Sequence, residues 1–158
     1  MITFLPYSDF EKSANCLDKK RCWKQVVEAK QIICTLRCDE IPESWKNTNS
    51  YIFQKWKNHP AVQMWKGYEE DIKVYYNVFL KICCNKFRIN TDLEELPIFY
   101  ILQKMPWWLN NEDFHRSHRA RLIEKDRSFY QHQFPEDEGF NNGKYLWPQN
   151  NTQTFKTI

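Results

Sequence analysis

Glycine is scarce in this sequence, with only three in 158 residues. Phosphate-binding P-loops and dinucleotide-binding turns need closely spaced glycines, because only glycine lets the backbone approach a phosphate group so closely. The nucleophile elbow of many serine esterases likewise requires a G-x-S-x-G turn. The glycine count therefore excludes these three kinds of enzyme site.

Long hydrophobic runs are also missing. No apolar stretch approaches the roughly 20 residues that a membrane-spanning helix needs, and no export signal opens the chain. We therefore expect an intracellular protein of the cytoplasm or nucleus that is not secreted. In that setting the six cysteines are expected to be reduced and mostly buried. Their spacings include no C-x2-C pair, so we predict neither a metal site nor a cofactor.

Aromatic residues are abundant by contrast. They make up 16% of the chain, which is ample material for a hydrophobic core and excludes disorder over most of the length. The length fits one globular domain. The formal net charge of +3 permits nucleic acid as a partner without requiring it.

Capping residues and hydrophobic periodicity predict an all-α (mainly α) fold, a compact single-domain helical bundle. Ser8 lies three residues before Glu11, the spacing of a capping box, and Asp18 is placed to cap the next helix. Thr91 and Glu94 form a second capping-box pair. The predicted helices span residues 8–17, 18–38, 60–85, 91–97 and 110–130.

The two longest helices have distinct patterns. Along residues 60–85, apolar residues recur at steps of three and four, which favours a core stripe. This stripe comprises Ala61, Trp65, Tyr68, Ile72, Tyr75, Phe79 and Ile82. The helix over 18–38 is predicted to bury one broad side and to present a charged side to solvent or a ligand. The buried side comprises Cys22, Trp23, Val26, Val27, Ala29, Ile33 and Leu36, and the charged side comprises Arg21, Lys24, Gln25, Glu28 and Gln31.

The domain is predicted to cover residues 1–148. Residues 39–54 are polar and irregular and are predicted to form an inserted loop. Residues 145–148 (YLWP) are expected to dock on the domain, and residues 149–158 to form a flexible tail.

Residues 115–127 (HRSHRARLIEKDR) form the most basic segment, with five Lys and Arg against two Asp and Glu. Arginine presents bidentate geometry to phosphate oxygens, so this density favours contacts with a nucleic-acid backbone. A solvated helix face with intrahelical ion pairs explains the same pattern. The sequence leaves both interpretations open.

The histidines His59, His115 and His118 also admit two interpretations. They could supply the ligands of a metal-assisted hydrolase, although no H-E-x-x-H or comparable spacing is present. The alternative is hydrogen bonding or phosphate contact, and either would depend on pH near neutrality.

Five segments spread along the chain carry a family resemblance. They are MITFLPYSDFEKSANCLDKKR, KQVVEAKQI, NHPAVQMWKGYEEDIKVYYN, MPWWLNNEDFHRSHRARLIEKDRSFY and YLWP. Together they resemble the pyrimidine-dimer DNA glycosylase (endonuclease V-like) family, strongly in its cellular branch and weakly in its phage enzyme. The resemblance covers most of the chain but leaves out residues 39–54 and 149–158.

The resemblance implies a small all-α monomer that grips kinked double-stranded DNA, extrudes a nucleotide and cleaves its glycosidic bond. In the family's phage enzyme the chain's own α-amine attacks deoxyribose C1′ and forms a Schiff base, and β-elimination then nicks the strand. An α-amine suits this reaction, because its pKa of about 8 leaves roughly a tenth of it unprotonated at pH 7. Extruding a base costs least at a damaged pair, which gives selectivity for lesions.

Carried over to this chain, the resemblance implies three catalytic residues. Met1 supplies the amine, Glu28 the carboxylate, and Arg21 a neighbouring positive charge. The DNA-binding candidates are Lys24, Gln25, His59, His115, His118, Arg119 and Arg121. The aromatic candidates to fill the vacated base stack are Trp65, Tyr68, Trp107 and Trp108. Core packing is the alternative for these four aromatic residues.

Two positions depart from the family pattern. The second residue is Ile2, whose size favours retention of Met1 and crowds its amine. Arg21 is followed by Cys22 where the phage-type enzyme has a glutamate, so the acidic role would pass to Glu28, two turns along the same helix face. Three functions therefore stay open. They are a DNA repair glycosylase for damaged or modified pyrimidines, with or without AP lyase activity, a non-catalytic nucleic-acid or nucleotide-binding domain, and a metal-assisted hydrolase.

Overall fold

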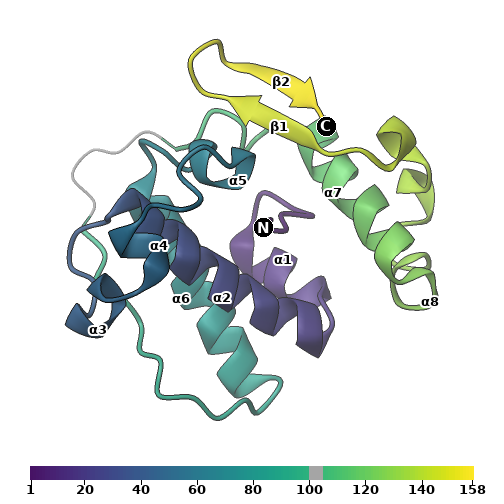
Figure 1. Cartoon of the computed structure of the whole chain (residues 1–158). Helices are drawn as coiled ribbons and strands as arrows, with labels where there is room; N and C mark the ends of the chain where they lie inside the picture. The colour runs from purple at the N-terminus through teal and green to yellow at the C-terminus, as the bar shows by residue number, and fades with distance from the viewer. Residues whose placement is uncertain (100–104) are drawn as a thin grey trace.

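The computed structural model describes residues 1–99 and 105–158 and is mainly helical (Figure 1). Two long helices, α2 (Lys19–Leu36) and α6 (Glu69–Asn85), pack against each other at the centre, and α1 (Phe10–Cys16) packs on α6. The first six residues lie between α2 and α7 (Glu112–Lys125). The shorter elements are α3 (Glu43–Lys46), α4 (Asn49–Ile52), α5 (Pro60–Gln63), α8 (Arg127–Tyr130), the 3-10 turns Pro135–Asp137 and Phe140–Gly143, and the strands β1 (Leu146–Gln149) and β2 (Thr154–Thr157).

The predicted mainly α class is confirmed, with the addition of one antiparallel hairpin near the end of the chain. In this hairpin, β1 pairs with β2 in the register Leu146 to Thr157. Residues 149–158, predicted as a flexible tail, instead include β2, because Phe155 packs its ring 5.0 Å from that of Trp107. Among the described helices, none has the length and apolar character needed to cross a membrane.

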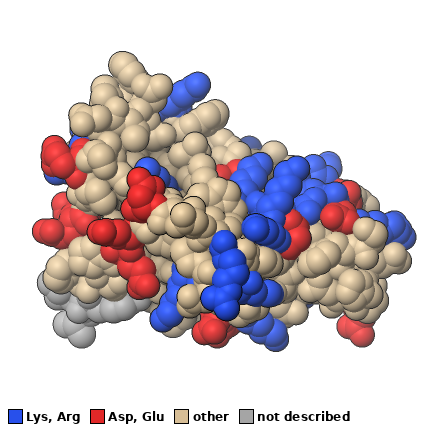
Figure 2. All heavy atoms as spheres, turned by 90° about the horizontal axis from the view of Figure 1, so that it is seen from below, with Lys and Arg blue, Asp and Glu red and all other residues tan. Residues whose placement is uncertain are grey.

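Charged side chains are unevenly distributed over the face seen from below in Figure 1. Lys and Arg gather toward the side of α7 and α8, whereas Asp and Glu predominate toward the side of α3 (Figure 2). A surface that separates charge in this way attracts a polyanion to one end of the molecule.

Helix α1 begins slightly later than predicted. Its cap is Asp9 instead of Ser8, and the Asp9 carboxylate accepts a hydrogen bond from Lys12 N at 2.7 Å. Asp18 caps α2 as predicted, accepting from Arg21 N at 3.0 Å. A short polar side chain directly before a run of periodic apolar residues thus marks the start of α1 and α2 to within one residue.

The single helix predicted over residues 60–85 is wrong, since residues 64–68 divide it into α5 and α6. Gly67 has a left-handed φ of +87°, which ends the helical path. The carbonyl groups freed there are bound by a distant side chain, because Asn150 Nδ2 donates to Gln63 O at 2.9 Å. The break is therefore stabilised by a tertiary contact that local periodicity does not reveal.

Two other predicted helices are also revised. Residues 91–97 are not helical, because Asn77 on α6 binds both backbone groups of Leu96 with its side-chain amide, each at 2.8 Å. The helix predicted over 110–130 is interrupted at Asp126, whose backbone (φ −158°, ψ 84°) is extended. There the chain starts again as α8 with Asp126 as its cap.

Residues 39–54, predicted as an inserted loop, contain the one-turn helices α3 and α4. Trp45 on α3 is buried, with its ring 5.4 Å from that of Tyr76 on α6. Lys30 of α2 places its ammonium 4.6 Å from the centre of the same indole. This segment is therefore packed onto the two central helices.

The face that α2 buries differs from the predicted one. Gln25 and Glu28, predicted on the charged side, are both buried, whereas Trp23 is half-buried and Val27 is exposed. The polar side chains can be buried because they accept hydrogen bonds from the backbone of the N-terminal segment. Periodicity of α2 alone carries no information about that segment.

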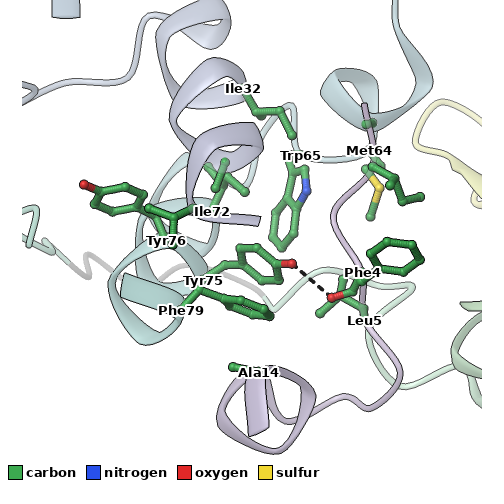
Figure 3. Packing of buried hydrophobic residues seen from close by; sticks show 14 of the residues in the cluster. Phe4, Leu5, Ala14, Ile32, Met64, Trp65, Ile72, Tyr75, Tyr76 and Phe79 are labelled. Atoms are coloured by element: carbon green, nitrogen blue, oxygen red, sulfur yellow. Dashed lines mark hydrogen bonds between the residues drawn. The ribbon is translucent and has the colours of Figure 1, made fainter. Parts of the chain in front are cut away.

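The core is built around Trp65 and Tyr75 (Figure 3). The Trp65 ring lies 5.0 Å from that of Trp108, and Tyr75 stacks on Phe79 at 4.2 Å. The Tyr75 hydroxyl lies 3.0 Å from Phe4 O, the contact drawn in Figure 3. The predicted stripe is buried at Ala61, Trp65, Ile72, Tyr75 and Phe79 and half-buried at Tyr68 and Ile82.

All six cysteines are free thiols, as predicted, and four of them are buried. Cys22 on α2 and Cys83 on α6 place their sulfur atoms 3.3 Å apart. This contact and burial raise the pKa of the Cys22 thiol. Cys22 therefore fills the contact between α2 and α6 as a neutral, nearly apolar group.

Replacing Tyr75 by Phe removes the hydroxyl beside Phe4 O and leaves that carbonyl without this donor. We expect the free energy of unfolding to fall by about 1–3 kcal/mol, the cost of an unsatisfied buried acceptor. Tyr76→Phe is the matched control, because the Tyr76 hydroxyl bonds Glu94 O at 3.2 Å in a less buried place. Urea denaturation of the three proteins measures both costs, and an equal or smaller loss for Tyr75→Phe would contradict the prediction.

Candidate active site

The N-terminal segment, residues 1–6, has its backbone held by side chains instead of by a neighbouring strand. Phe4 N donates to Gln25 Oε1 on α2 at 2.8 Å, and Leu5 N donates to His118 Nδ1 on α7 at 3.2 Å. Helix α6 adds the Tyr75 contact described above. Three helices therefore fix this segment, and with it the position of the first residue.

The side chain of Glu28, on α2, lies next to the start of this N-terminal segment. It is only 6% exposed, and its Oε2 accepts a hydrogen bond from Ile2 N at 2.5 Å. Consecutive backbone nitrogens are at most about 3.7 Å apart, so the Met1 α-amine lies within about 6 Å of that oxygen. Lys24 Nζ lies 3.5 Å from the other carboxylate oxygen. The buried Glu28 carboxylate and the Met1 α-amine are therefore close to each other.

His59 is half-buried and lies just before α5. Its Nδ1 accepts from Ala61 N at 3.1 Å and so caps α5. Burial lowers the pKa of His59, and the positive charge of the Met1 amine lowers it further. The imidazole lies edge-on to Trp56 at 5.9 Å and to Trp147 at 6.1 Å. His59 therefore lies between two indole rings, with its Nδ1 engaged as a hydrogen-bond acceptor.

Four cationic side chains form a basic rim near Glu28; they are Arg21, Lys24, Arg121 and Lys125. Burial lowers the pKa of Lys125, and the charges of the other three lower it further. Arg21 is held by Asp18 at 2.7 Å, and Arg121 by Glu124. In the part of the chain that the structure describes, no carboxylate lies within 4 Å of the Lys125 ammonium. This rim offers positive charge to an anionic ligand.

Tyr145, just before β1, lies against Arg121 of the basic rim. Burial raises the pKa of its hydroxyl, which the charge of Arg121 opposes and that of Glu28 reinforces. The Tyr145 hydroxyl and Arg121 Nε are both buried, and the two side chains lie against each other, with the Arg121 guanidinium carbon 5.7 Å from the centre of the Tyr145 ring. Tyr145 and Arg121 therefore form one polar pair near the Glu28 carboxylate.

A family model described as pyrimidine dimer DNA glycosylase matches residues 1–95. The chain belongs to the pyrimidine dimer DNA glycosylase family. Membership implies DNA repair glycosylase chemistry with DNA as the substrate. The matched region contains Met1, Glu28 and His59, whereas Arg121 and Tyr145 lie beyond it. No match was found among curated proteins or solved structures.

Four residues predicted to contact DNA instead hold the start of this glycosylase-family chain. They are Gln25, His115, His118 and Arg119, and all four are buried. Arg119 donates to Pro6 O at 2.7 Å and to Asp137 Oδ2 at 2.6 Å. Side chains buried to this degree do not reach a phosphate in this structure. Arg21, Lys24 and Arg121 are left at the surface.

The three histidines predicted as alternative metal ligands are not arranged as a ligand set. His115 places its ring nitrogens 2.7 Å from Leu5 O and 2.6 Å from Leu109 O. Over residues 1–99 and 105–158, no group of three or more His, Cys, Asp or Glu side chains has the geometry to hold a metal ion. The arrangement therefore gives the metal-assisted hydrolase no support.

The four aromatic residues predicted to fill the vacated base stack differ in how deeply they are buried. Trp65 and Trp108 have no exposed surface, and Trp65 Nε1 donates to Thr3 Oγ1 at 3.0 Å. Neither indole can stack on a base in this structure. Tyr68 and Trp107 are half-buried, and Trp107 Nε1 is bonded to Asn150 at 3.1 Å.

The sequence did not indicate Trp56, Lys125, Tyr145 and Trp147 as members of the candidate site. Lys125 was one of several cations in a basic segment, and nothing local distinguished it. Residues 145–148 were expected to dock, but not beside Glu28. For Trp56 a signal exists, since it lies between two lysines in a stretch without acidic residues (51–68).

His118 should make the stability of the protein pH-dependent. Burial, with the charges of His115 and Arg119, holds its pKa well below 6.5 in the folded protein, whereas the unfolded chain titrates near 6.5. Because the pKa of His118 is lower in the folded protein than in the unfolded chain, its contribution to the free energy of unfolding is complete above pH 6.5. It should fall by up to about 1.4 kcal/mol per pH unit as the pH drops further.

Urea denaturation at pH 7.5, 6.5 and 5.5 measures this slope. In His118→Asn the amide oxygen can still accept from Leu5 N but does not titrate, so the slope between pH 6.5 and 5.5 should become smaller. Equal slopes for the wild type and the variant would assign the pH dependence to other groups.

Proposed function

We propose that this protein is a DNA glycosylase that removes damaged or modified pyrimidines from duplex DNA, with AP lyase activity through a Schiff base on the Met1 amine. The observation that carries the proposal is the hydrogen bond from Ile2 N to Glu28 Oε2 at 2.5 Å. It sets an α-amine beside a buried carboxylate in a member of this family. The amine is the group that such chemistry requires as its nucleophile.

The position of Ile2 supports the same proposal. A bulky second residue would crowd the amine if its side chain pointed toward the site. The Ile2 side chain is instead part of the core cluster, and the residue is only 8% exposed. The bulk of Ile2 is therefore directed into the protein, and the obstacle expected from the sequence is removed.

The chemistry assigns distinct roles to the amine and to Glu28. The unprotonated Met1 nitrogen forms a bond to C1′ while the glycosidic bond breaks and the base leaves with the electron pair. The C1′–O4′ bond then opens to give the Schiff base. Loss of a proton from C2′ breaks the C3′–O bond and cleaves the strand. The Glu28 carboxylate would stabilise positive charge at C1′ and accept and return protons.

The basic rim supports binding of the DNA backbone. Arg21, Lys24, Arg121 and Lys125 would contact phosphates on either side of the extruded nucleotide, since cations at this density suit phosphate oxygens. Tyr145 and Arg121, which lie against each other, would face the sugar or phosphate that approaches Glu28. His59 would stay neutral beside the amine and so keep a second positive charge away from it.

Borohydride trapping tests the nucleophile directly. A duplex with one abasic site exposes the C1′ aldehyde, which condenses with the amine, loses water and is reduced by borohydride to a stable secondary amine. We expect a covalent adduct whose attachment point, found by mass spectrometry of peptides, is Met1. A protein extended by ten residues at its N-terminus should lose the adduct, and the same extension at the C-terminus should not.

Two results would count against this proposal. An adduct that persists after the N-terminal extension would transfer the role to a lysine. Binding of the abasic duplex with neither an adduct nor strand cleavage would favour a non-catalytic DNA-binding domain.

Glu28→Gln should reduce the rate of strand cleavage at a pyrimidine dimer by about 10²- to 10⁴-fold, the range for loss of a general acid or base. The amide oxygen of Gln can still accept from Ile2 N, so the fold should be kept. Glu43→Gln, a change of an 82% exposed side chain on α3, is the matched control and should leave the rate unchanged. Nicking of UV-irradiated duplex DNA gives the rates. A less than threefold effect of Glu28→Gln would remove Glu28 from the mechanism.

A further inference from the structure

The loop between α4 and α5, residues 53–59, carries two large aromatic side chains at the surface. Phe53 is 72% exposed and Trp56 is 37% exposed. Exposed aromatic side chains that lie close together on a surface mark a binding site more often than isolated ones do. The loop is therefore a candidate for contact with a flat apolar ligand.

This loop lies next to the candidate active site. The Trp56 ring is 5.9 Å from that of His59, the His59 ring is 6.1 Å from that of Trp147, and the Trp147 ring is 5.6 Å from that of Tyr145. His59 also caps α5, so the end of the loop is fixed by a hydrogen bond from Ala61 N. Trp56 is thus joined to the candidate active site through the rings of His59 and Trp147.

The charge around the loop suits nucleic acid. Residues 51–68 contain three lysines (Lys55, Lys57 and Lys66) and no Asp or Glu. The Lys55 ammonium lies 5.3 Å from the centre of the Trp56 ring. A polar groove of about 370 Å³ beneath the loop is lined by Lys57 and Lys66, among others. Aromatic faces interleaved with cations are the arrangement that binds bases and phosphates together.

We propose that Trp56 stacks on a base of duplex DNA next to the extruded nucleotide, while Phe53 at the outer part of the loop contacts the neighbouring step. This inference rests on the proposed function and adds the residue that recognises the opened base stack. An exposed indole can replace the stacking that the duplex loses when a nucleotide leaves. The core indoles Trp65 and Trp108 cannot do so, because they have no exposed surface.

The test uses two duplexes that differ only at one position. One carries a tetrahydrofuran abasic analogue, which has no aldehyde and cannot form a Schiff base, and the other is undamaged. We expect Trp56→Ala to weaken binding of the tetrahydrofuran duplex by about 10- to 100-fold, the range for one stacked base. Binding of the undamaged duplex should change less than threefold. Trp56→Phe, which keeps a ring, should stay within about threefold on both duplexes.

Phe129→Ala is the matched control. Phe129 is 38% exposed, almost the same as Trp56, but lies on α8 at the opposite side of the molecule from α4 (Figure 1). The Phe129→Ala variant should bind both duplexes with the affinity of the wild type. A fluorescent 2-aminopurine beside the tetrahydrofuran should be quenched on binding by the wild type and by Trp56→Phe, and stay bright with Trp56→Ala.

Two outcomes would overturn the proposal. The first is binding of the tetrahydrofuran duplex by Trp56→Ala within twofold of the wild type. The second is an equal loss on both duplexes, which would make Trp56 a general DNA contact. Borohydride trapping of the wild type reports separately on the proposed chemistry. A selective loss by Trp56→Ala without trapping would thus reject the lyase and keep the stacking residue.

Discussion

The hydrogen bond between the Ile2 amide and the Glu28 carboxylate is the contact on which the candidate site depends. A carboxylate is costly to bury unless its charge is offset and its oxygens are bonded. Here one oxygen accepts from the Ile2 backbone and the other lies 3.5 Å from Lys24. The buried polar groups of α6 and α7 serve the same end, because they hold the N-terminal segment at the place where Glu28 meets it.

Much of the fold could be predicted from local chemistry. Asp18 marks the start of α2, and the apolar stripe of α6 marks the core, because capping and periodicity act within a few residues. The interruption at Gly67 and the absence of a helix over 91–97 could not be predicted. In both places a side chain distant in sequence, Asn150 or Asn77, binds backbone groups that a helix would otherwise use.

The candidate site could be predicted only in part. The family resemblance indicated Met1 and Glu28, and the structure shows them close together. The sequence misassigned the polar residues Gln25, His118 and Arg119, since their types suit a phosphate and a buried backbone equally well. Which of the two they bind depends on the course of the first six residues, and no periodicity encodes that course. Burial likewise separates Trp56 from Trp65, two indoles that the sequence alone cannot rank.

The cap that His59 provides to α5 lies between the groups proposed to react and the loop proposed to recognise DNA. On one side of it stand the amine and the carboxylate, fixed by the central helices. On the other side is the surface loop 53–59, and surface loops tolerate substitution and changes of length far better than helices do. If both proposals hold, changes in this loop alone would alter which lesions such a protein prefers, while Met1 and Glu28 keep their positions.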